Sequence, residues 1–251
     1  MRPDYAVAYQ RLYREHWWWR AREDLIVGWL RRLVPPGGFG PILDVGCGDA
    51  LFFDRLRELG EPQGVEMDPS LVTDAGRRRG PIHVGSFDET FRPGTRFGLV
   101  LMLDVIEHFA ADVESLRRAL DLLAPGGTIV ITIPAFPVLW TSHDVVNRHY
   151  TRYTRASFAA VAERAGLRVE HTRYLFQWTV PVKLAVRLKE RLRPGPAPLP
   201  SVPAAPINRA LYWLSRAEAA SYGRLPLPFG SSLLVVGRQR SPSALAGLAR
   251  R

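Results

Sequence analysis

Cysteine is nearly absent from this sequence, because Cys47 is the only one among 251 residues. We therefore expect neither a disulfide framework nor a cysteine metal cluster, and we interpret Cys47 as a small residue filling a tight turn. No stretch approaches about 18 consecutive apolar residues, and the first residues do not resemble a signal peptide. The sequence thus predicts a soluble, intracellular protein. Its 47% of apolar residues is ample for the core of one large α/β domain with an insertion.

Acidic side chains are scarce in the second half of the chain. Residues 1–144 carry 16 basic and 20 acidic side chains, whereas residues 145–251 carry 18 and 4. A positive field of this kind favours an anionic partner, such as a phosphorylated or carboxylated substrate, a lipid headgroup or nucleic acid. Because 32 of the 34 basic residues are arginine, a general compositional preference accounts for part of the surplus.

The stretch 41–68 has the pattern of a strand, a tight turn, a helix and a second strand. The run Ile-Leu-Asp-Val suits a buried parallel strand, and Gly46 and Gly48 follow directly, where the backbone must turn sharply and approach a ligand. Apolar residues then recur at helical spacing from Leu51 to Leu59, and a glycine ends that helix. The second strand ends near Glu66, 18 residues after Gly48. In such folds a carboxylate at this place accepts hydrogen bonds from the two ribose hydroxyls.

Two classes of nucleotide ligand compete for this arrangement. A dinucleotide requires a glycine at the sixth position of the turn motif, and that position is Leu51. Asp44 would also repel a pyrophosphate, whereas it could pair with the cationic amino group of a methionine moiety. These two residues favour a cationic nucleoside without phosphates and oppose an NAD-type oxidoreductase.

The run Leu43–Gly48 resembles the first motif of class I S-adenosylmethionine-dependent methyltransferases, with Ala50 in place of the third small residue, usually Gly. The resemblance implies S-adenosylmethionine as the cofactor and an α/β fold with a Rossmann-like seven-stranded methyltransferase sheet. In the family an Asp commonly stands beside the adenine at the position of Ser86. Ser86 departs from that pattern, and Asp88 could take the place of the missing carboxylate. The expected cofactor-binding residues are Asp44, Gly46, Cys47, Gly48, Glu66, Met67, Ser86, Phe87, Leu103 and Asp104.

A helical pattern runs from Tyr5 to Leu33 and contains three consecutive tryptophans, Trp17 to Trp19. Three adjacent tryptophans cannot all face one side of a helix, so at least one covers something other than the domain's own core. One interpretation is a helix lying across the sheet edge. The other is a lid, residues 1–39, whose aromatic faces attract the sulfonium or wall the acceptor pocket. The His-Trp-Trp leader is similar to those of bacterial methyltransferases of glycan, lipid and secondary metabolism, which favours the lid.

The methyltransferase domain is expected to span residues 40–240, with a tail at 241–251. Thr154 is expected to cap a helix that Gly166 ends. A Pro-Gly-Gly turn at 125–127 precedes an apolar strand, another feature of the family. The remaining expected strands are 81–84, 97–103, 128–133, 167–176 and 231–238, and the remaining expected helices are 69–79 and 112–123.

A long insertion, residues 178–228, separates the last two expected strands. A proline-rich connector, residues 194–206, divides it into a first helix that Pro181 opens and a second helix at 207–222. The first helix carries one apolar and one basic stripe, formed by Leu184, Leu188 and Leu192 and by Lys183, Arg187 and Arg191. One interpretation is a cap packed over the sheet. The other is a basic amphipathic face resting on a membrane or a lipid-linked acceptor, with the leucines as apolar wall and the basic residues as positive rim.

Methyl transfer from a sulfonium is an in-line displacement, so such an enzyme mainly holds donor and acceptor at attack distance and removes a proton where one must leave. Polar and aromatic residues gather at 134–153, after the fifth strand, where an open parallel sheet handles its substrate. A structural hydrogen-bonding role is the alternative for each candidate base. The candidate catalytic residues are His108 at the end of the fourth strand and His143, His149 and Tyr150 in this loop, with Asp144 among them.

A metal site is a further possibility at the same place. Asp104, Glu107 and His108 are spaced i, i+3 and i+4, so they would share one face of a helical turn, and His149 could complete a site for a hard divalent ion. This set resembles the cluster of the methyltransferases that modify the terminal ribose of small RNAs. In the larger small-molecule families the Glu-His pair is usual without metal, so the sequence leaves the metal unassigned.

Together these patterns predict an S-adenosylmethionine-dependent methyltransferase that acts on a small-molecule acceptor derived from a sugar, a lipid or a secondary metabolite. We expect it in the cytoplasm, with peripheral membrane contact and an anionic or lipid-linked acceptor as options. The alternative is an RNA-directed or other nucleic-acid methyltransferase, suggested by the basic second half. The chain lacks an RNA-binding module and the exposed stacking pattern that such modules need, so no nucleic-acid partner is expected.

Overall fold

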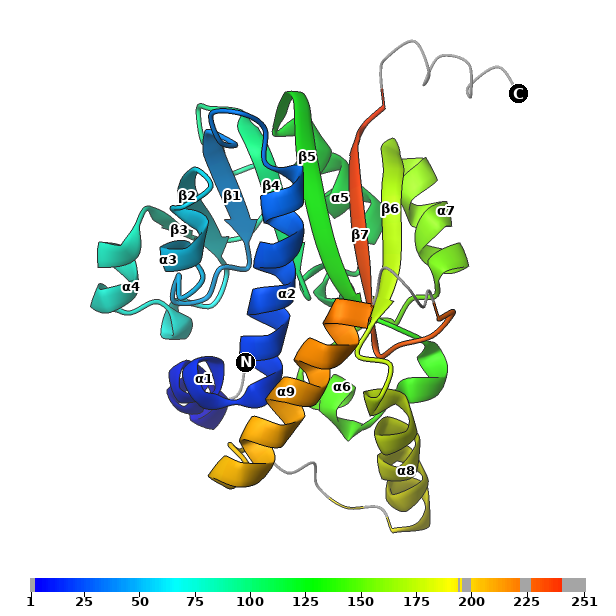
Figure 1. The fold of residues 1–251 in the computed structure, drawn as a ribbon. Coiled ribbons are helices and arrows are strands. Elements are labelled where there is room, and N and C mark those ends of the chain that lie inside the picture. The colour runs from blue at the N-terminus through cyan, green and yellow to red at the C-terminus, as the bar shows by residue number, and fades with distance from the viewer. Residues whose placement is uncertain (1–2, 194, 196–199, 222–226, 241–251) are drawn as a thin grey trace.

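A seven-stranded sheet forms the centre of the molecule (Figure 1). The computed structural model describes residues 3–193, 195, 200–221 and 227–240. The strand order is β3-β2-β1-β4-β5-β7-β6, and in the described part of the chain β7 runs antiparallel to both neighbours while the other pairs are parallel. This topology confirms the predicted Rossmann-like methyltransferase sheet. The strands are β1 (Pro41–Val45), β2 (Glu61–Glu66), β3 (Ile82–Val84), β4 (Phe97–Leu103), β5 (Leu123–Pro134), β6 (Leu167–Leu175) and β7 (Ser232–Gln239).

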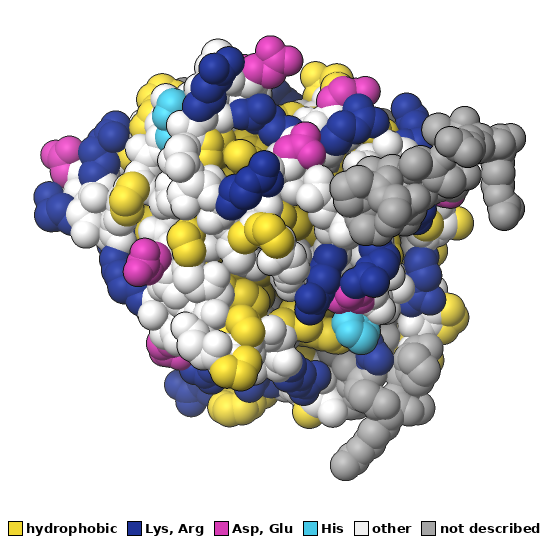
Figure 2. All heavy atoms as spheres, turned by 90° about the horizontal axis from the view of Figure 1, so that it is seen from above, with side chains coloured by type: hydrophobic (Ala, Val, Ile, Leu, Met, Phe, Trp, Pro, Cys, Tyr) yellow, Lys and Arg dark blue, Asp and Glu magenta, His cyan; other side chains and the backbone are white. Residues whose placement is uncertain are grey.

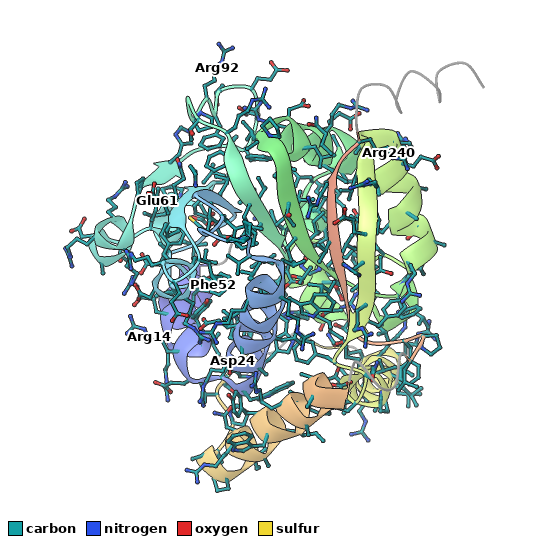
Figure 3. All side chains as sticks on the ribbon, turned by 45° about the horizontal axis from the view of Figure 1, so that its top comes forward. Arg14, Asp24, Phe52, Glu61, Arg92 and Arg240 are labelled. Atoms are coloured by element: carbon teal, nitrogen blue, oxygen red, sulfur yellow. The ribbon has the colours of Figure 1, made fainter. Side chains whose placement is uncertain are left out.

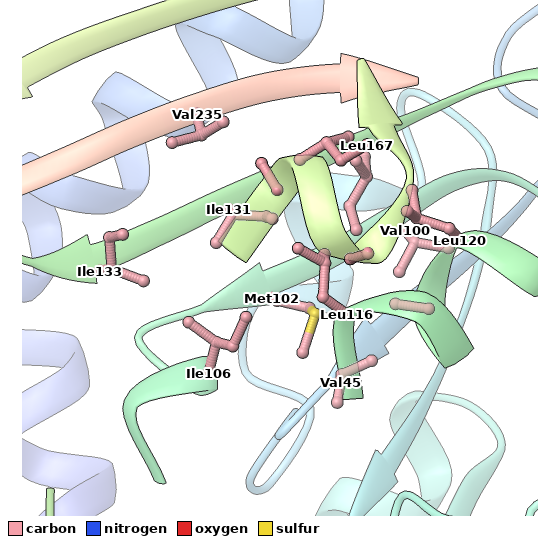
Figure 4. Packing of buried hydrophobic residues seen from close by; sticks show 14 of the residues in the cluster. Val45, Val100, Met102, Ile106, Leu116, Leu120, Ile131, Ile133, Leu167 and Val235 are labelled. Carbon is pink, nitrogen blue, oxygen red and sulfur yellow. The ribbon is translucent and has the colours of Figure 1, made fainter. Parts of the chain in front are cut away.

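Helices cover both faces of this sheet, and alternate strand residues point to opposite faces. On one side Val100 and Met102 pack with Leu116 of α5 (Asp112–Asp121), as Figure 4 shows, and α7 (Arg155–Ala165) completes that layer. On the other side Leu101 packs with Ile26 of α2 (Trp17–Leu33). All five of these side chains are fully buried or nearly so, which is the principal source of the domain's stability.

The carboxyl ends of the parallel strands meet at one edge of the sheet. Val45 of β1 lies in register with Val65 of β2 and Met102 of β4, so the turns that follow these strands are neighbours. At this end of the sheet, the lower end in Figure 1, lie α1 (Pro3–Glu15), α6 (Ser142–Val146), α8 (Thr179–Leu192) and α9 (Ala205–Ser221).

The N-terminal helices and the insertion pack against each other. Asn208 of α9 joins the two N-terminal helices, because its Oδ1 accepts from the Trp17 amide at 2.8 Å and its Nδ2 donates to the Glu15 carbonyl at 2.8 Å. The hydroxyl of Tyr212 donates to Asp24 Oδ2 at 2.6 Å, on the side of α2 that faces α9 (Figure 3). The N-terminal segment and the insertion therefore form one helical layer, although about 190 residues separate them in the sequence.

Several predicted boundaries are wrong for identifiable reasons. The single helix expected from Tyr5 to Leu33 is two helices, because His16 has an extended backbone and its Nδ1 caps α2 by accepting from the Trp18 amide. The helix expected at 51–59 shrinks to α3 (Phe53–Leu56), because Ala50 still has a φ of +53°. The helix expected at 69–79 divides into the short 3₁₀ helix η1 (Pro69–Leu71) and α4 (Asp74–Arg79).

The predicted Pro-Gly-Gly turn lies inside β5 rather than before it. Phe97 of β4 pairs with Leu123, and two residues later Leu99 pairs with Thr128, so residues 124–127 bulge out of the ladder. The capped helix was predicted correctly, since Thr154 caps α7 and Gly166 ends it with a φ of +84°. Much of the proline-rich connector, the predicted helix end at Tyr222 and the tail at 241–251 lie outside the described residues.

Candidate functional site

The glycine turn after β1 has a backbone conformation and a close packing that require glycine. Gly46 and Gly48 have φ values of +72° and +55°, a region that favours glycine. A Cβ at Gly46 would lie 2.6 Å from Cγ2 of Val105, and a Cβ at Gly48 would lie 2.9 Å from the hydroxyl of Tyr9. The turn is therefore wedged between the end of β4 and helix α1. Cys47 between the glycines is buried, which agrees with its interpretation as a small filling residue.

Glu66 holds the turn and the end of β2 together. Its Oε2 accepts from the Gly48 amide at 2.9 Å, and its Oε1 accepts from the Asp68 amide at 2.8 Å. The side chain is 7% exposed, and burial raises the pKa of its carboxyl group. Each carboxylate oxygen keeps a further lone pair, so Glu66 can still accept from hydroxyl groups of a nucleoside.

Asp44, two residues before the turn, is a buried acid. It is 5% exposed, and burial raises its pKa to about 7, with Arg22 opposing the shift and Glu66 adding to it. A cationic group bound beside it would favour the carboxylate form. Asp44 therefore fits a partner that carries an ammonium group.

Arg22 is a site residue that the sequence did not predict. Its Nη2 lies 2.6 Å from Oδ2 of Asp104, which follows β4 with a φ of +56°. Its guanidinium also lies 5.4 Å from the centre of the Trp18 ring, one turn earlier on α2. Helical spacing could have indicated that Arg22 faces the sheet. It lies four residues after Trp18 and four before Ile26, on the face that α2 turns toward the sheet.

Asp49 is a second residue that sequence reasoning missed. It is fully buried, and its Oδ2 accepts from Nε2 of Gln10 at 2.7 Å while its Oδ1 accepts from the Thr73 amide at 2.8 Å. Arg79 also donates to it, at 3.3 Å. Asp49 thus fastens α1 and α4 to the glycine turn, so its role is to position the turn.

The remaining expected cofactor-binding residues, and Asp88, lie in different environments. Met67 is 71% exposed at the end of β2, and Ser86 is exposed in the turn after β3. Phe87 is buried in the core, with its ring 6.0 Å from that of Phe91, and Leu103 is partly buried. Asp88 Oδ1 accepts from both the amide and the hydroxyl of Thr90, so it stabilises its own turn.

Asp144 organises the loop after β5. Its carboxylate accepts from Arg152 Nε at 2.8 Å and Nη2 at 3.0 Å, from the Thr141 amide at 2.9 Å, and from Nδ1 of His149 at 2.9 Å. Burial opposes ionisation, but the hydrogen bonds from His149 and Arg152 outweigh it and lower the pKa of Asp144. This ionised, buried carboxylate fixes the position of His149.

Of the four candidate catalytic residues, the structure brings His108 and His149 together. Their ring centres lie 4.7 Å apart at an angle of 84°, and Nε2 of His149 lies 4.0 Å from Oε1 of Glu107. The amide of Tyr150 donates to the Glu107 carbonyl, while the Tyr150 side chain is 65% exposed. His143 lies apart on α6, where its Nε2 is 2.9 Å from Nδ2 of Asn147.

Helix α8 turns basic residues toward this loop, not away from it. Arg187 donates to the carbonyls of Pro137 and Trp140, and Lys183 is partly buried, with its pKa lowered to about 8 by burial and by Arg152. The leucine stripe is exposed, up to 73% at Leu192. Lys183 and Arg187 of the basic stripe therefore face the loop, and the leucines face solvent.

An open hollow of about 460 Å³ lies on the α5 and α7 side of the same loop. It is lined by residues that include Phe109, Tyr150, Arg152 and Ser157. Arg152 therefore connects this hollow to the Asp144 carboxylate.

Comparison with known proteins decides the family. A family model described as "Methyltransferase domain" matches residues 18–172, which is more than half of the chain. The chain belongs to this methyltransferase family. The matched range includes the glycine turn, Glu66, Asp104 and the loop after β5, and S-adenosylmethionine is the cofactor of this family. The wedged glycine turn and the buried carboxylates of Asp44 and Glu66 fit this cofactor, and the dinucleotide interpretation is excluded.

Curated relatives match part of the methyltransferase. It is 30% identical over 125 residues to a ubiquinone biosynthesis O-methyltransferase of Azorhizobium caulinodans, covering 45% of this chain and 49% of the relative. It is also 30% identical over 97 residues to the enzyme of the same name from Bradyrhizobium diazoefficiens, covering 36% and 38%. The methyltransferase thus spans about half of the first relative and less of the second.

Solved structures share its fold. A methyltransferase of Haloferax volcanii, solved in complex with the Trm112 methyltransferase activator, has a TM-score of 0.61 at 20% identity and 95% coverage of both chains. The N-methyltransferase NodS of Bradyrhizobium japonicum, in complex with S-adenosylhomocysteine, has a TM-score of 0.55 at 14% identity, covering 92% of this chain and 91% of NodS. No helix in the described part of the methyltransferase is long and apolar enough to cross a membrane.

Proposed function

We propose that this enzyme methylates a hydroxyl group of a small-molecule acceptor derived from a lipid, a sugar or a secondary metabolite. The observation that carries the proposal is the meeting of the glycine turn, Glu66 and the His149 loop at one edge of the sheet. The names of the curated relatives support an oxygen acceptor. The same names give no support to a nucleic-acid acceptor.

The donor side is assigned to residues around the glycine turn. Bound S-adenosylmethionine supplies an electrophilic methyl group, and the chain's own residues hold the rest of that molecule. Glu66 would accept from the ribose hydroxyls, Asp44 would pair with the amino group of the methionine part, and Arg22 would face its carboxylate. Tyr9 of α1 lies over Gly48, which supports a role of residues 1–39 as a lid.

The acceptor side is assigned to the loop after β5 and to His108. The Nδ1–H of His149 donates to the Asp144 carboxylate, so the lone pair of Nε2 is free to accept a proton from an acceptor hydroxyl. Although His108 as a whole is exposed, desolvation of its ring and the neighbouring His149 lower its pKa to about 4, so it is neutral at physiological pH. Lys183 supplies a positive charge on the same side, which suits an acceptor with an anionic group.

Peripheral membrane contact through α8 is the second part of the proposal. The outward face of α8 exposes a continuous set of apolar side chains, and the basic residues Lys189, Arg191 and Arg193 are exposed beside them. A helix with these two neighbouring surfaces can rest on an anionic lipid surface. On the opposite end of the molecule, which Figure 2 shows, Lys and Arg side chains are spread among Asp and Glu instead of forming one stripe.

Two measurements test the proposed function. Calorimetry is expected to give S-adenosylmethionine a Kd on the order of micromolar, and tighter binding of NADH would contradict the donor assignment. Mass spectrometry of molecules that co-purify with the protein, followed by assays with S-adenosylmethionine, is expected to identify a hydroxylated small molecule that gains one methyl group. Methylation of RNA or DNA alone would contradict the acceptor class.

A further inference from the structure

Glu107 has a buried side chain without a hydrogen-bond partner among the described residues. It lies in η2 (Ile106–His108), directly after the end of β4, and it is 0% exposed. Neither of its carboxylate oxygens has a hydrogen-bond donor within the described residues. A buried carboxylate in this state is costly, so either a bound cation or the carboxyl group's own proton must neutralise it.

Two histidines present nitrogen atoms to the same place. One ligand atom each from Glu107, His108 and His149 can be chosen so that all three lie within 4.8 Å of one another. Divalent zinc binds imidazole nitrogen and carboxylate oxygen at about 2.0–2.2 Å, so an ion at the centre would draw these atoms together by roughly 1 Å. His108 is exposed and His149 only partly buried, so their side chains can make that adjustment.

The orientation of His149 is what a metal ligand requires. Its Nδ1 donates to the ionised carboxylate of Asp144 at 2.9 Å, and Arg152 holds that carboxylate in place. The lone pair of Nε2 therefore faces Glu107, at 4.0 Å from Oε1. Histidines that bind metals usually donate their other ring N–H to a carboxylate in this way.

We propose that Glu107, His108 and His149 bind a divalent transition-metal ion, with Asp144 as the residue that positions His149. Two imidazoles and one carboxylate suit Zn²⁺, Co²⁺ or Fe²⁺ better than Mg²⁺ or Ca²⁺, which prefer oxygen ligands. Asp104, which the sequence placed in this cluster, is instead paired with Arg22.

Three protein ligands leave coordination positions open at the edge of the sheet that carries the acceptor loop. Val105, two residues before Glu107, is also the side chain that lies against Gly46, so the cluster is close to the glycine turn. An acceptor oxygen bound to the ion would become a stronger acid and would lose its proton more easily.

The test uses the full chain after treatment with a chelator, and it requires no acceptor. Titration with Co²⁺ is expected to produce visible absorption that saturates at about one ion per chain, and Zn²⁺ is expected to displace it. Glu107→Gln keeps the shape of the side chain but removes a charged ligand. It should weaken Co²⁺ binding by more than the ~10–100-fold that is typical when a residue hydrogen-bonded to a ligand is replaced. Asp144→Asn is expected to weaken binding within that ~10–100-fold range.

His149→Ala removes one of the three proposed ligands and should also weaken Co²⁺ binding. Its matched control is His171→Ala, because His171 lies on β6 with its ring 6.0 Å from Trp29 and outside the cluster. It should bind Co²⁺ as the unaltered chain does. Thermal unfolding of each metal-free variant checks that it is folded. Absence of saturable Co²⁺ and Zn²⁺ binding, or unchanged binding in Glu107→Gln, would overturn the proposal and assign Glu107 as a protonated acid. The donor assignments are independent of this result, whereas a bound ion would occupy Nε2 of His149, so that the ion and not this nitrogen would promote loss of the acceptor proton.

Discussion

Asp44 is expected to make cofactor binding depend on pH. Its carboxyl group is buried and titrates near pH 7, mainly because burial disfavours the charged form. Pairing with the amino group of S-adenosylmethionine requires the carboxylate, so binding should release a proton when the free protein holds Asp44 protonated. Replacement by asparagine removes this titration while it preserves the shape of the side chain.

The magnitude follows from the pKa of about 7. The carboxylate fraction rises from ~3% at pH 5.5 to ~76% at pH 7.5, so the affinity should increase about 25-fold, equivalent to about 2 kcal/mol. Above that range the amino group of the cofactor itself loses its proton, with an ordinary pKa of about 7.7–8.0, so the affinity should fall again. The range of the experiment is therefore pH 5.5 to 7.5.

The stability of the cofactor-free protein should change in the opposite direction. The folded pKa of Asp44 lies above its unfolded value of 3.8, so the folded state binds the proton more tightly. The free energy of unfolding should therefore fall as pH rises from about 4 to about 7, by at most roughly 4 kcal/mol from this residue. Asp44→Asn should remove this part of the pH dependence.

Calorimetry in buffers of different ionisation enthalpy measures both the affinity and the number of protons released. Asp44→Asn should bind with an affinity that varies little from pH 5.5 to 7.5, and Asp74→Asn, an exposed residue at the start of α4, is the control. A flat profile in the unaltered protein, or an equal slope in Asp44→Asn, would refute the assignment of Asp44 to the amino group.

Three further predictions concern other parts of the molecule. Glu66→Ala should weaken S-adenosylmethionine binding by about 1.5–3 kcal/mol in calorimetry, since it removes a charged acceptor, and an unchanged Kd would contradict the ribose assignment. Neutral replacements of Lys189, Arg191 and Arg193 together should reduce sedimentation with anionic vesicles, at ~1 kcal/mol per residue, and leave cofactor binding unchanged; equal sedimentation would remove the membrane contact. Gly98→Ala should lower the thermal unfolding temperature strongly, because its Cβ would lie 1.9 Å from the Phe39 carbonyl oxygen, whereas the open position Gly28→Ala should not.

Elements with local signals were predicted well from the sequence. β4 has the predicted bounds, Phe97–Leu103, because an uninterrupted apolar run suits a strand buried on both faces. α7 has predictable ends because Thr154 and Gly166 act within one turn of the helix. The short length of α3 was not predictable. Apolar residues at helical spacing can also be buried by an irregular turn, and the turn before α3 continues as far as Ala50, which has a positive φ.

Residues that depend on distant partners could not be found in this way. Helical spacing indicates the face of α2 on which Arg22 lies, but it does not indicate Asp104, 82 positions away, as the partner of Arg22, nor Thr73, 24 positions away, as the partner of Asp49. The face that α8 exposes could not be predicted for a related reason. Spacing identifies an apolar stripe and a basic stripe on a helix, but the partners on the neighbouring loop decide which stripe turns inward.

Those partners explain how α8 can serve the acceptor without affecting the donor. Glu190 accepts from the amide and hydroxyl of Ser142 at 3.0 and 2.6 Å, and Arg187 donates to the Trp140 carbonyl at 3.0 Å. The inner side of α8 therefore holds the start of the loop that carries His149, while its outer side exposes Leu188 and its apolar neighbours. The glycine turn is held by a separate set of contacts, through Glu66 and Asp49. A surface bound to the outer side of α8 would thus act on the acceptor loop, and its loss should appear in the acceptor's KM before it appears in the affinity for S-adenosylmethionine.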